Sequence, residues 1–212
     1  GGYHGHTGLA VAAGDAQYRD PFAAALPFFV QIPYNDLAAM ERTVDGDTAA
    51  VILEAIPATL GMAMPEPGYL AGVQAICRRQ GARFIMDEVQ TGLGRTGRFW
   101  SHEYDDVAPD VIVTAKGLSG GIYPLSATLL APDLYACFDD HPLAHISTYG
   151  GSEIGCAAAL AVLDVVQDPK FLPRVLEVSD RLAKAFEGFP FGLRRRGLFM
   201  AFKLHGATDG KP

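Results

Sequence analysis

Cysteine and long apolar runs are both scarce in this chain of 212 residues. The three cysteines, Cys77, Cys137 and Cys156, are too few and too widely spaced for a disulfide framework or a zinc site. We expect reduced, mostly buried thiols, as in cytoplasmic proteins. No apolar run approaches the roughly 18 residues that cross a bilayer, and the sequence opens without a signal-peptide pattern. These absences predict a cytoplasmic protein without a membrane partner.

Basic residues are outnumbered, because 17 Lys and Arg stand against 24 Asp and Glu, a net charge of −7. This balance argues against a nucleic-acid partner, which normally needs a basic face. Hydrophobic residues make up 49% of the chain, enough to bury a core. His4 and His6 have no cysteine or carboxylate cluster beside them, so we expect no metal site.

Short apolar runs alternate with helical patterns, which predicts an α/β domain with a mostly parallel sheet. Strands are expected over residues 49–54, 83–86, 110–115 and 125–130, and extended structure over 192–204. Helices are expected over residues 68–80, 152–166 and 173–187. The second helix is almost wholly apolar and should be buried. The third is amphipathic, with an expected inward face of Val175, Val178, Leu182 and Phe186.

Lys116 closes one predicted strand and precedes a glycine-containing turn. An amine beside an apolar core is costly to charge, and the uncharged amine is a nucleophile that can form a Schiff base. The alternative is a lysine that extends from the strand end into solvent. The motif alone leaves both interpretations open.

Two acidic residues, Glu54 and Asp87, also end apolar strands. Ligands of open parallel sheets bind outside the carboxyl ends of the strands, so these residues and Lys116 are expected to converge on one pocket. A carboxylate there suits a positively charged ligand atom. A turn cap is the alternative for Asp87.

Two further segments contain two or more glycines. Residues 147–152 combine hydroxyls, glycines and a helix start, which favours an anion site, and N-capping by Ser152 is compatible with it. Residues 92–97 fit the G-x-G-x-x-G pattern of dinucleotide-binding proteins, but no long helical pattern follows and Pro109 comes soon after. A nicotinamide-dependent oxidoreductase is therefore the weaker interpretation.

Together these motifs resemble the class III (ornithine/GABA-type) aminotransferases of pyridoxal-phosphate fold type I, from Tyr3 to about Leu204. The matching stretches are residues 3–7, 87–92, 95–97, 115–121 and 147–151. The resemblance implies a three-layer α/β/α large domain over residues 1–190, incomplete at its N-terminus, and the truncated start of a small domain over 191–212. We therefore expect the chain to be a fragment.

The resemblance implies a pyridoxal-phosphate-dependent aminotransferase that moves an amino group between an amino compound and a 2-keto acid, and a homodimer. Lys116 is implied to form the Schiff base with the cofactor and to shuttle the proton. The other implied cofactor-binding residues are Tyr3 stacked on the ring, His4 beside it, Asp87 at the pyridine nitrogen, Val89 on the other ring face, Gln90 at the phenolic oxygen and Thr148 at the phosphate across the dimer interface.

Three positions are the candidates for substrate contact. His6 stands where ornithine-type members often have an arginine that grips a carboxylate, and Thr59 stands where many members have a second glutamate that gates substrates. Glu54 matches a family glutamate near the cofactor. The two departures weaken any claim for ornithine, acetylornithine or GABA as the substrate.

Other activities stay open. An aminomutase, decarboxylase or phospho-lyase of the same family would use the same pocket, and residues 3–6 resemble the aminomutase and phospho-lyase branches. An inactive remnant is a further alternative. The resemblance places a phosphate-binding loop before Tyr3 and a substrate-binding arginine in the small domain, and neither lies in this chain.

Overall fold

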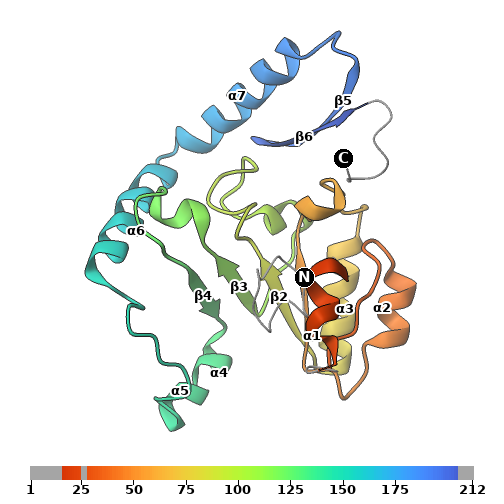
Figure 1. The fold of residues 1–212 in the computed structure, drawn as a ribbon, viewed down its shortest axis with the longest axis vertical. Helices are drawn as coiled ribbons and strands as arrows, with labels where there is room; N and C mark the ends of the chain where they lie inside the picture. Colours follow the sequence, from red (N-terminus) through yellow and green to blue (C-terminus); the bar gives the residue numbers. More distant parts are fainter. Residues whose placement is uncertain (1–15, 25–27, 205–212) are drawn as a thin grey trace.

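A four-stranded, mostly parallel sheet forms the centre of the computed structural model, which describes residues 16–24 and 28–204 (Figure 1). In spatial order its strands are β1 (Ala50–Glu54), β2 (Arg83–Asp87), β3 (Val111–Thr114) and β4 (Ala127–Leu130). The first three run parallel and β4 is antiparallel to β3. The predicted α/β fold with a mostly parallel sheet is confirmed.

The register of the strands brings their carboxyl ends to the same level. Glu54 is paired with Asp87, and Asp87 with Val113 on the next strand. Residues paired across a sheet project from the same face, so the side chains of Glu54 and Asp87 are neighbours on one face. Lys116 follows the end of β3 by two residues and begins the short helix η4 (Lys116–Ser119).

The opposite face of the sheet carries the core. Leu53, Phe84 and Met86 alternate with the acidic strand ends and pack against α3 (Tyr69–Gln80). α2 (Leu37–Thr43) packs on the outer side of α3 (Figure 1). Gly81 ends α3 in a left-handed conformation with φ of 78°, and its N–H donates to the Cys77 carbonyl oxygen.

Four of the remaining elements follow the predicted order with small shifts at their ends: α6 (Glu153–Val166), α7 (Phe171–Ala185), β5 (Phe191–Arg196) and β6 (Phe199–Leu204). The others, like α2, were not predicted: α1 (Ala16–Ala23), η2 (Ala58–Leu60), η3 (Ser101–Asp105), α4 (Pro132–Tyr135) and α5 (Cys137–Asp140). β5 and β6 form an antiparallel hairpin beside α7 (Figure 1). The predicted domain boundary at residues 190–191 falls just before β5 and stays a prediction.

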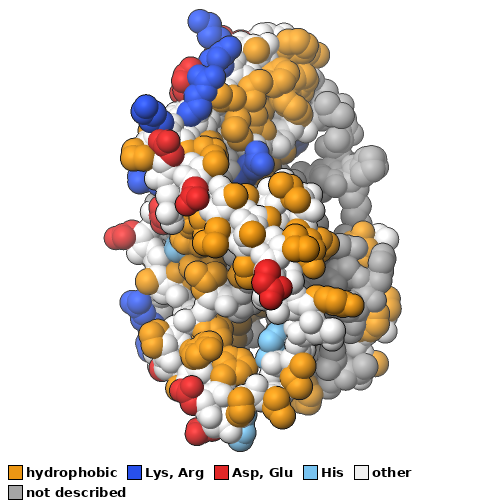
Figure 2. Space-filling model, turned by 90° about the vertical axis from the view of Figure 1, so that its left-hand side faces the viewer, with side chains coloured by type: hydrophobic (Ala, Val, Ile, Leu, Met, Phe, Trp, Pro, Cys, Tyr) orange, Lys and Arg blue, Asp and Glu red, His pale blue; other side chains and the backbone are white. Residues whose placement is uncertain are grey.

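The predicted burial of α6 is wrong for most of the helix. Only Gly155 and Val166 are buried, while Ile154 and Leu160 are 67% and 63% exposed. α6 lies on the left-hand side of Figure 1, the face shown in Figure 2, where apolar side chains reach the surface. An apolar helix sequence indicates that burial is favourable, but it does not identify the element that buries the helix.

Burial also differs from expectation at two cysteines and on α7. Cys77 is buried, but Cys137 and Cys156 are exposed, so the prediction of mostly buried thiols is wrong. On the predicted inward face of α7, Val175 is buried whereas Leu182 is 37% exposed. The helical period thus predicts which face of α7 a residue lies on, but it does not predict how deeply that residue is buried.

Two structural findings bear on the classes of site that the chain could hold. No helix in the part of the chain that the structure describes is long and apolar enough to cross a membrane. The same part contains no group of three or more His, Cys, Asp or Glu side chains that could hold a metal ion. His4 and His6 lie outside the described residues.

The contribution of α3 to the core can be tested by substitution. Leu70→Ala removes a side chain with no solvent exposure, and we expect it to lower the free energy of unfolding by about 2–5 kcal/mol because a cavity remains. Leu60→Ala, at a side chain that is 49% exposed, should cost less than about 1 kcal/mol. Urea unfolding of both variants measures the difference. Equal losses would contradict the described core.

Candidate active site

Glu54 is a buried carboxyl group at the end of β1, with 5% of its surface exposed. Its pKa is raised from 4.5 to about 7, first by burial and then by the negative charge of Asp87. The backbone amide of Ala58 and the positive charge of Lys116 act in the opposite direction. Glu54 and Asp87 are paired at the ends of β1 and β2, and Lys116 follows the end of β3, so the amine and the two carboxyl groups lie at the same end of the sheet.

Asp87 is held in a fixed position at the end of β2. Its Oδ1 accepts a hydrogen bond from the backbone N–H of Val89 at 3.0 Å, and the residue is only 8% exposed. No donor of the described residues reaches its Oδ2. The turn-cap alternative is therefore correct for one oxygen, and the other oxygen stays available to a ligand.

Lys116 has a backbone conformation that is rare for a residue with a side chain. Its φ is 43°, in the left-handed region that costs an L-residue about 1–2 kcal/mol. Such conformations persist where the surrounding structure imposes them, and they are concentrated at functional sites. Lys116 is exposed, and its side chain lines a cavity.

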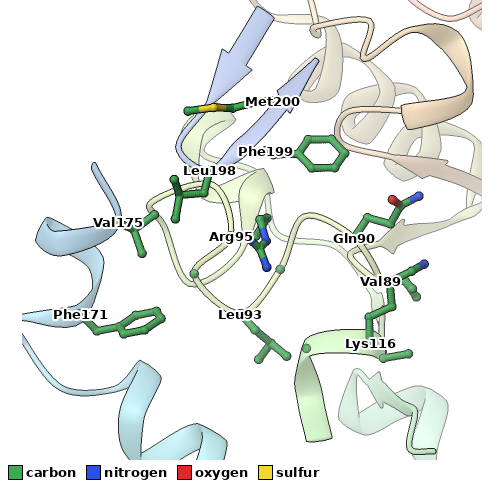
Figure 3. Close-up of a pocket in the computed structure, with 14 residues that line it drawn as sticks. Val89, Gln90, Leu93, Arg95, Lys116, Phe171, Val175, Leu198, Phe199 and Met200 are labelled. Carbon is green, nitrogen blue, oxygen red and sulfur yellow. The ribbon is translucent and has the colours of Figure 1, made fainter. Parts of the chain in front are cut away.

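This cavity has a volume of about 390 Å³ and lies between the 92–97 loop, α7 and the β5–β6 turn (Figure 3). Val89 and Gln90, which the sequence predicts as cofactor contacts, line it together with Lys116. The structure therefore brings Lys116, Val89 and Gln90 to one cavity and places Asp87 at the adjacent strand end.

Other predicted site residues lie elsewhere. Thr59 is exposed in η2, immediately after β1. Thr148 is exposed between α5 and α6 and does not line the cavity of Lys116. Tyr3, His4 and His6 lie outside the described residues.

Glu88 and His102 form a buried pair that the sequence does not reveal. Glu88 is 1% exposed, and its Oε1 accepts from the backbone N–H of His102 at 2.9 Å and lies 3.0 Å from His102 Nδ1. The hydroxyl of Thr91 donates to Oε2 of the same carboxyl group. Fourteen residues separate the pair, and no periodic pattern links them, so the contact follows only from the path of the loop.

Glu88 also anchors the chain through its backbone. Its N–H donates to the Val113 carbonyl oxygen at 2.8 Å, and its carbonyl oxygen accepts from Gly92 N–H at 3.0 Å. A Cβ at Gly92 would lie 2.7 Å from the Trp100 ring, so only glycine allows this approach. The residues that follow Asp87, among them Val89 and Gln90, are thereby fixed relative to β3.

The glycine pattern at residues 92–97 does not begin a long helix. It forms a loop with left-handed conformations at Leu93, Gly94 and Gly97, with φ of 55°, 83° and 88°. The next helical element is the five-residue η3. The described geometry therefore lacks the long helix N-terminus that would receive a dinucleotide pyrophosphate.

The family model named Aminotransferase class-III matches residues 1–211. The chain belongs to the class III aminotransferases. An uncharacterized aminotransferase of Archaeoglobus fulgidus is 49% identical over 96% of this chain and 50% of its own length. The chain thus spans about half the length of the curated relatives that it matches.

Solved structures of aminotransferases share the fold. Ornithine aminotransferase of Toxoplasma gondii superposes with a TM-score of 0.85 at 32% identity, over 96% of this chain and 50% of that one. Taurine:2-oxoglutarate aminotransferase of Bifidobacterium kashiwanohense, in complex with PLP and glutamate, gives 0.83 at 28% identity, over 96% and 52%. The expected resemblance and the pyridoxal-phosphate fold type I are confirmed.

The raised pKa of Glu54 predicts a pH-dependent stability. Because the pKa is about 7 in the folded protein and 4.5 ordinarily, the folded state holds this proton more tightly than the unfolded chain does. The contribution of this protonation to the free energy of unfolding is fully present below pH 4.5. It is lost as the pH rises to about 7, and the loss is at most about 3 kcal/mol. Glu54→Gln should lack this loss in urea unfolding measured across that range without added cofactor. The exposed Glu66→Gln is the control, and parallel curves for Glu54→Gln and wild type would contradict the assignment.

Removal of the Glu88 carboxyl group should destabilise the protein strongly. Glu88→Ala leaves the buried donors of His102 and Thr91 without an acceptor, at about 1–3 kcal/mol for each unsatisfied group. Thermal unfolding of Glu88→Ala and of the exposed Glu66→Ala compares the two sites. A loss as small as that of Glu66→Ala would show that the cluster contributes little.

Proposed function

We propose that this chain carries the catalytic region of a pyridoxal-phosphate-dependent aminotransferase, which moves an amino group between an amino compound and a 2-keto acid. The observation that carries the proposal is the convergence of Glu54, Asp87 and Lys116 at one end of the sheet in a class III aminotransferase chain. Pyridoxal phosphate, when bound, supplies an electron sink for the substrate carbon.

The residues present fit this cofactor. The Oδ2 of Asp87, which no described donor reaches, suits a protonated pyridine nitrogen. Lys116 suits the aldehyde carbon because its amine borders the same cavity as Gln90, whose amide suits the phenolic oxygen. Val89 adds an apolar contact for the ring. Tyr3 and His4 stay predicted contacts.

Lys116 has two functions in this proposal. Its Nζ would hold the cofactor covalently through the aldehyde carbon. The same Nζ would be the group that accepts the proton from the substrate carbon and returns it. The Asp87 carboxyl group would hold the ring nitrogen of the cofactor, and burial together with the negative charge of Asp87 raises the pKa of Glu54 beside it to about 7.

We further infer that the protein acts as a homodimer. Thr148 is exposed and does not line the cavity of Lys116 in its own subunit. A cofactor phosphate that Thr148 binds would therefore be the phosphate of the cofactor held by the other subunit. The exposed apolar residues of α6 support an additional covering partner. A cytoplasmic location stays a prediction of the sequence.

A visible absorption spectrum tests the proposal. The wild-type protein with added pyridoxal phosphate should show the band of the lysine-bound cofactor, and Lys116→Ala should lack it because no amine replaces Nζ. Lys184→Ala, on the exposed face of α7, is the control and should keep the band. The same band in wild type and Lys116→Ala would remove Lys116 from this role.

The reaction itself is tested by the need for an acceptor. An aminotransferase forms product from the amino donor only while a 2-keto acid is present, whereas a phospho-lyase, decarboxylase or aminomutase of the same family needs none. Product analysis with and without the keto acid therefore separates these activities. Sustained turnover without an acceptor would contradict the aminotransferase.

A further inference from the structure

Glu88 is a buried carboxyl group directly after Asp87, and the proposed chemistry does not use it. It does not line the cavity of Lys116, and neither does its partner His102. Both side chains are buried, as is that of Thr91, the second partner. Acidic side chains are almost never fully buried unless they are paired, because removing a carboxyl group from water is costly. A buried acid in this position is therefore a candidate for a function besides packing.

The carboxyl group of Glu88 connects two distant points of one loop. Its Oε1 accepts from the backbone N–H of His102 at 2.9 Å and lies 3.0 Å from His102 Nδ1, and its Oε2 accepts from the hydroxyl of Thr91. Glu88 and His102 are fourteen residues apart, so one side chain joins the two ends of the segment between them. Both carboxyl oxygens have buried partners, so this group holds the chain rather than a ligand.

The segment that Glu88 holds includes two residues of the candidate site. Val89 and Gln90 follow it directly, and both line the cavity of Lys116 (Figure 3). The Val89 N–H donates to Oδ1 of Asp87 at 3.0 Å. The orientation of the Asp87 carboxyl group therefore depends on the backbone that follows Glu88. Because Oδ1 is bound in this way, the carboxyl group is restricted, and Oδ2 is the oxygen that remains for a ligand.

We propose that Glu88 is a positioning residue for the cofactor. Its contacts to His102 and Thr91 hold the loop in place, and the loop holds the Val89 N–H. This N–H sets the orientation of Asp87, so that Oδ2 is directed to the ring nitrogen of pyridoxal phosphate. Glu88 itself touches neither the cofactor nor the substrate. The inference rests on the proposed function, because it needs a ring nitrogen beside Asp87.

A cofactor analogue without the ring nitrogen separates positioning from stability. The deaza analogue of pyridoxal phosphate has a C–H group at that place and keeps the aldehyde and the phosphate, so it cannot make the Asp87 contact. A loss of stability alone weakens the binding of both molecules by the same factor, whereas a misplaced Asp87 weakens only the binding of pyridoxal phosphate. The ratio of the two Kd values, from spectrophotometric titration of the apoprotein with each molecule, is the measurement.

In the wild type we expect the Kd of the analogue to be about 10- to 100-fold that of pyridoxal phosphate, since a charge-assisted hydrogen bond is missing. Glu88→Ala should reduce this ratio at least about fivefold, as the loss of comparable outer contacts does at metal sites. Glu88→Gln keeps the shape of the side chain and an acceptor for the His102 N–H, so its ratio should stay within about twofold of the wild type. Asp87→Ala should abolish the preference for the ring nitrogen.

Two further substitutions control for stability and folding. Leu70→Ala destabilises the core on the opposite face of the sheet without touching the loop, so its ratio should equal that of the wild type. Thr91→Val keeps the shape of the side chain and removes only the hydroxyl donor, so it replaces Glu88→Ala if that variant does not fold. Its ratio should fall about threefold, and Thr91→Ser, which keeps the hydroxyl, should restore the wild-type ratio.

An unchanged ratio in Glu88→Ala, or in Thr91→Val where Glu88→Ala does not fold, would overturn the positioning role and leave Glu88 with a contribution to stability alone. An equal fall of the ratio in Leu70→Ala would do the same. A wild-type protein without the lysine-bound cofactor band, or without a preference for the ring nitrogen, would overturn the proposed function instead. The two failures are therefore distinguishable.

Discussion

The parallel register of β1, β2 and β3 is the constraint on which the candidate site depends. It sets Glu54 directly beside Asp87 and puts both carboxyl groups level with the strand that leads to Lys116. Burial raises the pKa of Glu54 first, and the negative charge of the neighbouring Asp87 raises it further. The positive charge of Lys116 acts in the opposite direction. The proximity of the two carboxyl groups is therefore unfavourable, and a cationic ligand atom beside them would make it less so.

Two adjacent acidic residues at the end of β2, Asp87 and Glu88, have different functions. Asp87 ends β2 beside Glu54, and Glu88, the next residue, accepts hydrogen bonds from His102 and Thr91. One carboxyl group stays available to a ligand because the other anchors the loop that follows. One residue of this consecutive pair thus makes the loop rigid, and the other leaves a carboxyl oxygen free in the candidate site.

Short-range patterns in the sequence were enough to predict the four strands of the sheet, the helices α3, α6 and α7 and the acidic strand ends, because each depends on a local run or period of apolar residues. They did not predict α1, α2, α4 or α5. They were not enough for α6 or Cys156, whose exposure depends on what other chain segments cover. The Glu88–His102 contact and the part that the 92–97 loop takes in the cavity of Lys116 also escaped prediction. Both arise from a loop whose left-handed turns at Leu93, Gly94 and Gly97 have no periodic signature.

The loop at residues 92–97 connects the end of β2 to α7. Glu88, which precedes this loop, is tied to β3 by its N–H and to Gly92 by its carbonyl oxygen. Further along the loop, a Cβ at Gly94 would lie 2.7 Å from the Phe171 ring, and one at Gly97 would lie 2.4 Å from Leu176. The loop is therefore held between the strand that ends at Asp87 and the helix that lines the far wall of the cavity of Lys116. In a fold built in this way, substitutions on the loop or on α7 can reshape the cavity while the register that aligns Glu54 and Asp87 is kept.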